Sequence, residues 1–207
     1  MASIPGCGLL IGQLRGTSFT TPERTNVSNP LYVSQKAAQA IVTIVVPYTH
    51  TREIYGDNEE MWNLYRTAVD LVAEELGRVR GLKVVVLNTE KQKELGLFSQ
   101  SETNETLRRL GVAARSDAVL LYTRRPKPGG VDFGQMPSTM LFTGAVESLQ
   151  VMGLRLVSSA FGATVYEQNI EVKMTSGLGT TPESLLKARL RPAINLLVMD
   201  LARALGR

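Results

Sequence analysis

The sequence predicts an α/β fold in which helices pack against a mixed β-sheet. Three observations support this: β-branched runs separated by helical patterns, a long stretch of alternating residues after them, and a helical pattern at the end. Strands separated by helices are typical of parallel neighbours, whereas consecutive alternating strands are typical of antiparallel hairpins. The sheet should therefore contain both orientations.

The first half begins with a buried strand and a long helix. Residues 40–46 are nearly all apolar and β-branched, as in a central strand, and Pro47 ends the run. An apolar stripe at helical spacing covers residues 59–79. Asp57 can cap this helix, and Glu60 completes a capping box.

Two further buried strands are predicted at residues 82–87 and 118–122. Thr89 can begin a short helix between them, and another helix is expected around residues 103–114. Because a helix separates each strand from the next, right-handed crossovers are expected wherever neighbouring strands run parallel.

The pattern changes in the second half. Residues 125–130 contain two prolines and two glycines and predict a loop, and residues 139–173 alternate with period two. A turn at residues 158–162 should join two antiparallel strands. One face of the last strand should hold Tyr166, Gln168, Ile170 and Val172. A final helix, kinked near Pro192, completes the chain.

Composition limits the class of protein. The chain has 207 residues, of which 43% are hydrophobic and 20% charged, and this suits one globular domain with an appended arm. The 23 basic and 19 acidic residues give a net charge of +4 and are spread along the chain. No apolar stretch approaches the roughly 20 residues that a membrane-spanning helix needs. The charge permits an anionic partner without requiring one.

The N-terminal segment contains the only cysteine, Cys7. Residues 4–7 read Ile-Pro-Gly-Cys and resemble the lipobox at which bacterial lipoprotein signals are cleaved. The cysteine would then carry lipid, and a basic and apolar signal would be expected upstream. The alternative is an ordinary thiol, since matches of four residues are common. Residues 1–39 are predicted to form a tether or extended arm, and residues 40–207 the α/β domain.

The order of elements from about Ala40 to Gly206 resembles the superfamily that contains the TolB N-terminal domain, the curli secretion lipoprotein CsgG and the penicillin-binding-protein activator LpoB. The resemblance rests most on residues 154–157 (Leu-Arg-Leu-Val) and 162–166 (Gly-Ala-Thr-Val-Tyr). These are similar to the family's aliphatic strand, turn and aliphatic-aromatic return strand.

This resemblance implies a non-catalytic bacterial envelope lipoprotein that acts as an adaptor or assembly factor through contacts with other envelope proteins. It would be periplasmic and anchored to the outer membrane through lipid on Cys7. No cofactor or metal is expected, and self-association into a ring is compatible with the resemblance.

His50 is the only histidine, so the usual serine triad and multi-histidine metal sites are excluded. It follows the first strand, and the ends of strands in open α/β sheets are where ligands bind. A small enzyme with a site near His50 therefore stays as one alternative. A loop imidazole hydrogen-bonded to backbone is the favoured interpretation.

Exposed loops on a rigid sheet commonly carry recognition. The candidate contact surfaces are the loops at residues 48–55 and 124–130, and their candidate partner-binding residues are Tyr48, His50, Arg52, Tyr55, Arg124, Arg125 and Lys127. The basic residues could instead meet phosphate, which leaves a cytoplasmic nucleic-acid-binding domain as a second alternative. That alternative is disfavoured because the interleaved aromatics of a single-strand binder are missing.

Overall fold

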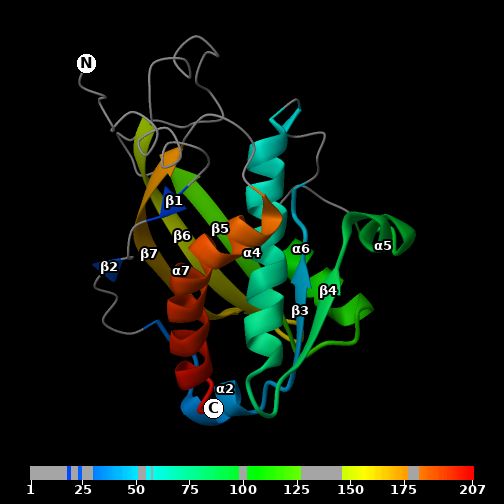
Figure 1. Cartoon of the computed structure of the whole chain (residues 1–207). Helices are drawn as coiled ribbons and strands as arrows, with labels where there is room; N and C mark the ends of the chain where they lie inside the picture. Colours follow the sequence, from blue (N-terminus) through cyan, green and yellow to red (C-terminus); the bar gives the residue numbers. More distant parts are fainter. Residues whose placement is uncertain are drawn as a thin grey trace, which may run out of the picture.

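A computed structural model shows a mixed β-sheet packed by helices, as the sequence predicts (Figure 1). The structure describes residues 18–19, 23–24, 30–50, 55–56, 58–97, 102–126, 146–176 and 182–207. The body of the sheet consists of β3 (Thr43–Pro47), β4 (Lys83–Leu87), β5 (Ala118–Pro126), β6 (Val146–Ser158) and β7 (Thr164–Ser176). The strands lie in the order β1-β7-β6-β5-β3-β4.

Strand orientation follows the connections along the chain. β3 is parallel to both β4 and β5, and helices join these strands. β5, β6 and β7 form an antiparallel run. Between β6 and β7 the chain turns at Gly162, whose φ of +66° favours glycine.

Part of the predicted N-terminal arm lies along the edge of β7. The short strands β1 (Ser18–Phe19) and β2 (Glu23–Arg24) both pair antiparallel with β7, and Leu31 forms an isolated bridge to Tyr166. The helix α2 (Gln35–Gln39) follows, capped by the hydroxyl of Ser34. These pairings cover the β7 edge of the sheet.

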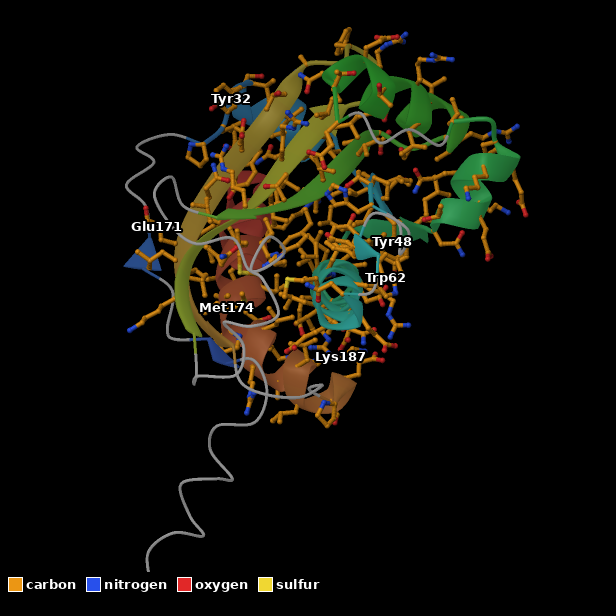
Figure 2. The ribbon with its side chains drawn as sticks, turned by 90° about the horizontal axis from the view of Figure 1, so that it is seen from above. Tyr32, Tyr48, Trp62, Glu171, Met174 and Lys187 are labelled. Carbon is orange, nitrogen blue, oxygen red and sulfur yellow. The ribbon has the colours of Figure 1, made fainter. Side chains whose placement is uncertain are left out.

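The helices cover the two faces of the sheet unequally. α4 (Glu59–Gly77) and α7 (Glu183–Ala204) lie side by side on one face, and α6 (Asn104–Ala113) lies on the other (Figures 1 and 2). α5 (Thr89–Glu94) follows β4. Pro192 lies inside α7, and in Figure 1 the first turns of this helix (orange) are inclined to the remainder (red). None of the helices in the described ranges is long and apolar enough to cross a membrane.

Each face has its own apolar core. The larger core packs β5, β6 and β7 against α4 and α7, and it contains the fully buried side chains of Tyr122 and Tyr166. All four residues predicted to share a face of β7 are buried: Tyr166, Gln168, Ile170 and Val172. The smaller core lies beneath α6 and includes Leu107, Leu110, Val119, Leu121 and Val157. On the same face of β5, Thr123 follows Leu121 two positions later, and from there the α6 side of the sheet is polar.

Two predictions about the parallel strands are wrong in detail. The first strand begins at Thr43, because Ala40 still belongs to the end of α2 as its C-cap. The strand predicted as buried at residues 82–87 is an edge strand in which Val85 and Val86 are each 40% exposed. Among the described strands only β3 pairs with it, so the apolar run reflects an edge partly covered by α4.

The start predicted for the loop at residues 125–130 is also wrong, while residues 127–130 lie outside the described residues. β5 continues through Pro126, and Arg124 and Arg125 pair with Met152 and Val151 of β6. In the described ranges β3 pairs with β5 only near its start, so no described strand lies against the other side of β5 at Pro126. A proline is tolerated where a neighbouring strand does not need its missing N–H.

The cap of α4 differs by one residue from the prediction. Oδ1 of Asn58 accepts a hydrogen bond of 3.1 Å from the Met61 N–H, which makes Asn58 the N-cap. An amide oxygen satisfies a free N–H of the first turn as well as a carboxylate does.

Candidate functional site

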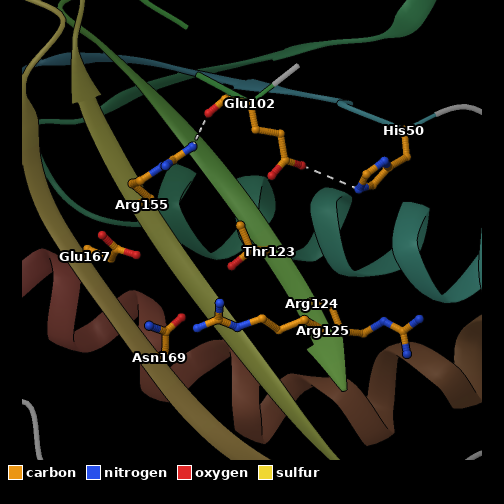
Figure 3. Close-up of a pocket in the computed structure, with 8 residues that line it drawn as sticks. All are labelled: His50, Glu102, Thr123, Arg124, Arg125, Arg155, Glu167 and Asn169. Carbon is orange, nitrogen blue, oxygen red and sulfur yellow. Dashed lines mark hydrogen bonds and ion pairs between the residues drawn. The ribbon is translucent and has the colours of Figure 1, made fainter. Parts of the chain in front are cut away.

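A hollow of about 570 Å³ lies on the α6 side of the sheet, past the part that α6 covers (Figure 3). We call it the polar basin and define it by its lining residues: His50, Glu102, Thr123, Arg124, Arg125, Arg155, Glu167 and Asn169. They come from three adjacent strands and from two segments that precede or follow regular elements. The basin lies beyond the carboxyl end of β3, where ligands commonly bind in open α/β sheets.

Strand register explains why the strand residues meet. Thr123 pairs with Gly153, and Gly153 pairs with Asn169, so these three form one row across β5, β6 and β7. Arg155 pairs with Glu167 in the adjacent row. Directly paired residues point to the same face of a sheet. Figure 3 accordingly shows their side chains around one hollow.

Gly153 leaves room for a polar group on the floor of the basin. A Cβ added there would lie 2.1 Å from Asn169 Oδ1 and 2.9 Å from Thr123 Oγ1. Both distances are too short for a real contact. The missing side chain therefore allows the Asn169 amide to extend over β6 toward Thr123.

Glu102 connects the segment before α6 with the segment after β3. Its Oε1 accepts a hydrogen bond of 3.1 Å from the Thr49 hydroxyl and lies 3.5 Å from His50 Nε2. Its backbone carbonyl accepts a hydrogen bond from the guanidinium of Arg155. Three contacts thus hold one residue in place at the rim of the basin.

An aromatic cluster forms the wall behind His50. The His50 ring centroid is 5.0 Å from that of Tyr65 and 6.0 Å from that of Tyr55, in edge-on arrangements that aromatic rings favour. The cluster continues through Tyr48, Trp62 and Tyr122. Tyr65 is buried, while Trp62 is only partly buried.

Burial determines the protonation of this wall. It lowers the pKa of His50 below its usual value; Glu102 opposes this effect and Arg124 reinforces it. Burial also raises the pKa of Tyr65 and of Tyr122, so both phenols stay protonated. The imidazole is therefore mainly neutral at pH 7.

Guanidinium groups outnumber carboxylates in the basin. Arg124 donates to Oε1 of Gln150 at 3.4 Å and contacts Met61 Sδ at 3.3 Å. Arg125 is exposed, and no ion pair joins it to any residue in the described ranges. Nε of Arg155 is buried without a hydrogen-bond partner in that part of the chain.

The charge balance follows from these groups. With His50 neutral, the described lining residues include three arginines and two glutamates and so carry one net positive charge. The guanidinium groups, the Asn169 amide and the Thr123 hydroxyl are all hydrogen-bond donors. Such a set suits a planar oxyanion, which arginine binds with paired hydrogen bonds. In the described ranges, no three histidine, cysteine or acidic side chains are placed to hold a metal ion.

The structure brings several of the predicted contact residues together. His50, Arg124 and Arg125 line the basin, and Tyr55 packs against His50. Tyr48 lies deeper, and its hydroxyl donates to Asp70. The remaining predicted positions, Arg52, Lys127 and Cys7, fall outside the described residues.

Five lining residues were not predicted: Glu102, Thr123, Arg155, Glu167 and Asn169. The sequence pattern could have identified Arg155, because it is a charged residue inside the apolar run 154–157. Glu167 and Asn169 had a weaker signal, since they alternate with buried positions in β7. Glu102 had none, because only the tertiary fold brings it to His50.

Comparisons with known proteins give weak similarity only. No family model and no curated protein matches the chain. Among solved structures, lipoprotein GNA1162 from Neisseria meningitidis is 15% identical with a TM-score of 0.41, covering 76% of this chain and 99% of that one. The PelC dodecamer from Paraburkholderia phytofirmans is 13% identical with a TM-score of 0.38, covering 87% and 95%.

A third similar structure belongs to the competence-damaged protein (CinA) superfamily and comes from Klebsiella pneumoniae. It is 11% identical with a TM-score of 0.36, and the match covers 83% of this chain and 91% of that one. The neighbours thus include a bacterial lipoprotein but differ in kind. At this level of similarity, none of them carries an argument about function.

Proposed function

We propose that this chain is a non-catalytic bacterial envelope lipoprotein that acts as an adaptor or assembly factor, contacting other envelope proteins through the polar basin. One observation carries the adaptor role: exposed and half-buried arginines open into one hollow beside an aromatic wall. Arginine and aromatic side chains dominate the binding energy of protein interfaces. Adjacent strands hold four of the lining side chains in register, which reduces the entropy lost on binding.

The proposed location in the bacterial envelope rests on the sequence. Residues 4–7 resemble a lipobox, and the order of elements resembles a superfamily of envelope proteins. Mass spectrometry of the native gene product from a membrane fraction tests this part. The expected result is a mass increase at Cys7 that corresponds to lipid, and an unmodified Cys7 in the soluble fraction would reject the lipid anchor.

The non-catalytic role is supported by how the groups near His50 are used. Oε1 of Glu102 is already the acceptor for the Thr49 hydroxyl, and the Tyr65 oxygen accepts from the Thr49 N–H. These groups hold the rim of the basin together, whereas Arg125 is exposed and no ion pair joins it to a described residue. Contact with a partner protein therefore depends on the arginines of the basin. An enzyme that used the basin as its active site would instead depend on His50.

Rescue of a deletion strain separates the two roles. We expect the double variant Arg124→Gln, Arg125→Gln to fail at equal protein level, and His50→Asn, which removes one aromatic contact but no positive charge, to restore most of the cellular phenotype. Arg80→Gln, an exposed change in the turn that follows α4, is the control. The opposite pattern, with His50 required and the arginines dispensable, would favour an enzyme.

A further inference from the structure

We infer that the polar basin binds an acidic segment of a partner protein, whose aspartate or glutamate carboxylates are held between Arg125 and Arg155. This inference rests on the proposed adaptor function and specifies the chemistry of the partner. It follows from three features of the basin: its hydrogen-bond donors, the carboxylates of its own glutamates, and the aromatic wall beside His50.

Four residues place hydrogen-bond donors along the same hollow: Arg155, Arg125, Asn169 and Thr123. Arg155 extends from β6 and is fixed by its hydrogen bond to the carbonyl of Glu102, while its buried Nε has no partner in the described part of the chain. Arg125 extends from β5, one strand away, and is exposed. Asn169 Oδ1 and the Thr123 hydroxyl lie above Gly153, and the NH2 of the same Asn169 amide is a donor. Fixed guanidinium groups beside neutral donors favour oxyanions with paired oxygen atoms.

The carboxylates of the basin argue against a long polyanion. Glu102 and Glu167 line the same hollow and would repel the closely spaced phosphates of a nucleic acid. A peptide differs, because its backbone N–H groups can donate to these glutamates while its acidic side chains meet the arginines. The mixed charge therefore favours an acidic peptide segment over nucleic acid.

The wall and the volume suit a peptide as well. His50 and Tyr55 place aromatic rings at one side of the basin, where they can pack against apolar side chains of the same segment. A hollow of about 570 Å³ accommodates a few side chains rather than a folded domain. The partner should therefore offer a short exposed stretch that combines acidic and apolar residues.

Fluorescence anisotropy with labelled hexaglutamate as the probe tests the inference on the full chain. We expect saturable binding that weakens as salt rises from about 0.05 to 0.5 M, because salt screens exposed charges. Arg125→Gln should weaken binding by about tenfold, the loss of one charge-assisted contact. Arg80→Gln should leave binding within about twofold of the wild type, because Arg80 lies in the turn that follows α4 and does not line the basin.

Two competitors distinguish other anions. Labelled hexaglutamine should not bind, and neither inorganic phosphate nor an oligothymidine should displace hexaglutamate at equal charge concentration. Equal loss with Arg125→Gln and Arg80→Gln would show nonspecific attraction and overturn the inference. Tighter binding of oligothymidine than of hexaglutamate would replace it with a nucleic-acid surface.

A second variant tests the floor of the basin. Gly153→Ala should displace the Asn169 amide and weaken hexaglutamate binding, with the fold checked by circular dichroism. If it unfolds the chain, Asn169→Ala tests the same donor without a clash. If a photoreactive residue at position 55 captures a protein in cells but hexaglutamate does not bind, the adaptor function stands and the acidic segment is rejected.

Discussion

The backbone N–H of Thr49 donates a hydrogen bond of 2.8 Å to the phenol oxygen of Tyr65, which joins the segment after β3 to α4. Both residues are buried, so water does not replace this bond. The same Thr49 donates through its hydroxyl to Glu102 at 3.1 Å. One tyrosine of the core thus positions the rim of the polar basin.

Tyr65→Phe should therefore destabilise the fold. The substitution leaves the buried Thr49 N–H without its acceptor, and an unsatisfied buried donor costs about 1–3 kcal/mol. Urea denaturation measures the change. Tyr32→Phe is the control, because Tyr32 is 62% exposed, and it should change the free energy of unfolding by less than about 0.5 kcal/mol. Equal stability of the two variants would contradict this role of Tyr65.

Two glycines in helices should respond with opposite signs to alanine. At Gly111 of α6 an added Cβ would lie 2.0 Å from Ser159 Oγ and 2.8 Å from a methyl of Val119, so Gly111→Ala should destabilise by about 1–3 kcal/mol. At Gly77 of α4 nothing lies within 4 Å, and Gly77→Ala should stabilise by up to about 1 kcal/mol. Thermal melts of both variants check the signs. Stabilisation by Gly111→Ala would show that α6 does not pack this closely on the sheet.

The sequence predicted the layers of this fold well and its edges less well. The alternation of Tyr166, Gln168, Ile170 and Val172 identified the buried face of β7 because one face of that strand meets a core. Burial of β4 was wrongly predicted, since a run of valines is equally compatible with a central strand and with a partly covered edge. Neighbouring strands, rather than local preference, decide between them.

Only part of the polar basin could be predicted from the sequence, because its other residues are brought together by contacts between distant segments. His50, Arg124 and Arg125 follow or end strands, and topology brings strand ends to one edge of a sheet. The floor at Gly153 depends on the pairing of three strands, and the contact of Glu102 with Thr49 depends on how the segment before α6 crosses the end of β3. Neither relation leaves a local pattern in the sequence.

Stability should fall as the pH drops below about 6.5, the ordinary pKa of histidine. Burial, opposed by Glu102 and reinforced by Arg124, lowers the pKa of His50 in the folded state. The unfolded chain then binds the proton more readily, so protonation favours unfolding between the lowered pKa and the ordinary one. His50 is the only histidine, so His50→Asn should flatten the change in the free energy of unfolding between pH 7.5 and 5.5.

The control for this experiment is NMR titration of the His50 ring in the folded protein. It should give a pKa below that of the same residue in urea-unfolded chain. A pKa above the unfolded value would reverse the sign and show that the contact with Glu102 outweighs burial.

Asp117 should be important for joining β3 to β5. Its Oδ2 accepts hydrogen bonds from the backbone N–H of Val42 at 3.0 Å and of Thr43 at 2.7 Å. Asp117→Ala removes both and should destabilise by about 1–3 kcal/mol. Asp117→Asn keeps an acceptor oxygen and should lose less, as measured by urea denaturation.

Glu90→Ala is a matched control for Asp117, because no hydrogen bond or ion pair joins the Glu90 side chain to any residue of the described ranges. It should change the free energy of unfolding by less than about 0.5 kcal/mol. A loss with Asp117→Ala no larger than that of Glu90→Ala would show that the two backbone groups find other acceptors.

Photo-cross-linking in cells tests the proposal of contact through the basin most directly. A photoreactive residue at position 55, where Tyr55 packs against His50 beside the basin, should form a defined covalent product with one envelope protein, and the same residue at position 80 should not. Adding Arg125→Gln or Arg155→Gln should reduce the product at position 55. Equal products from both positions, or none from position 55 while the chain is folded and complements the deletion, would contradict the account.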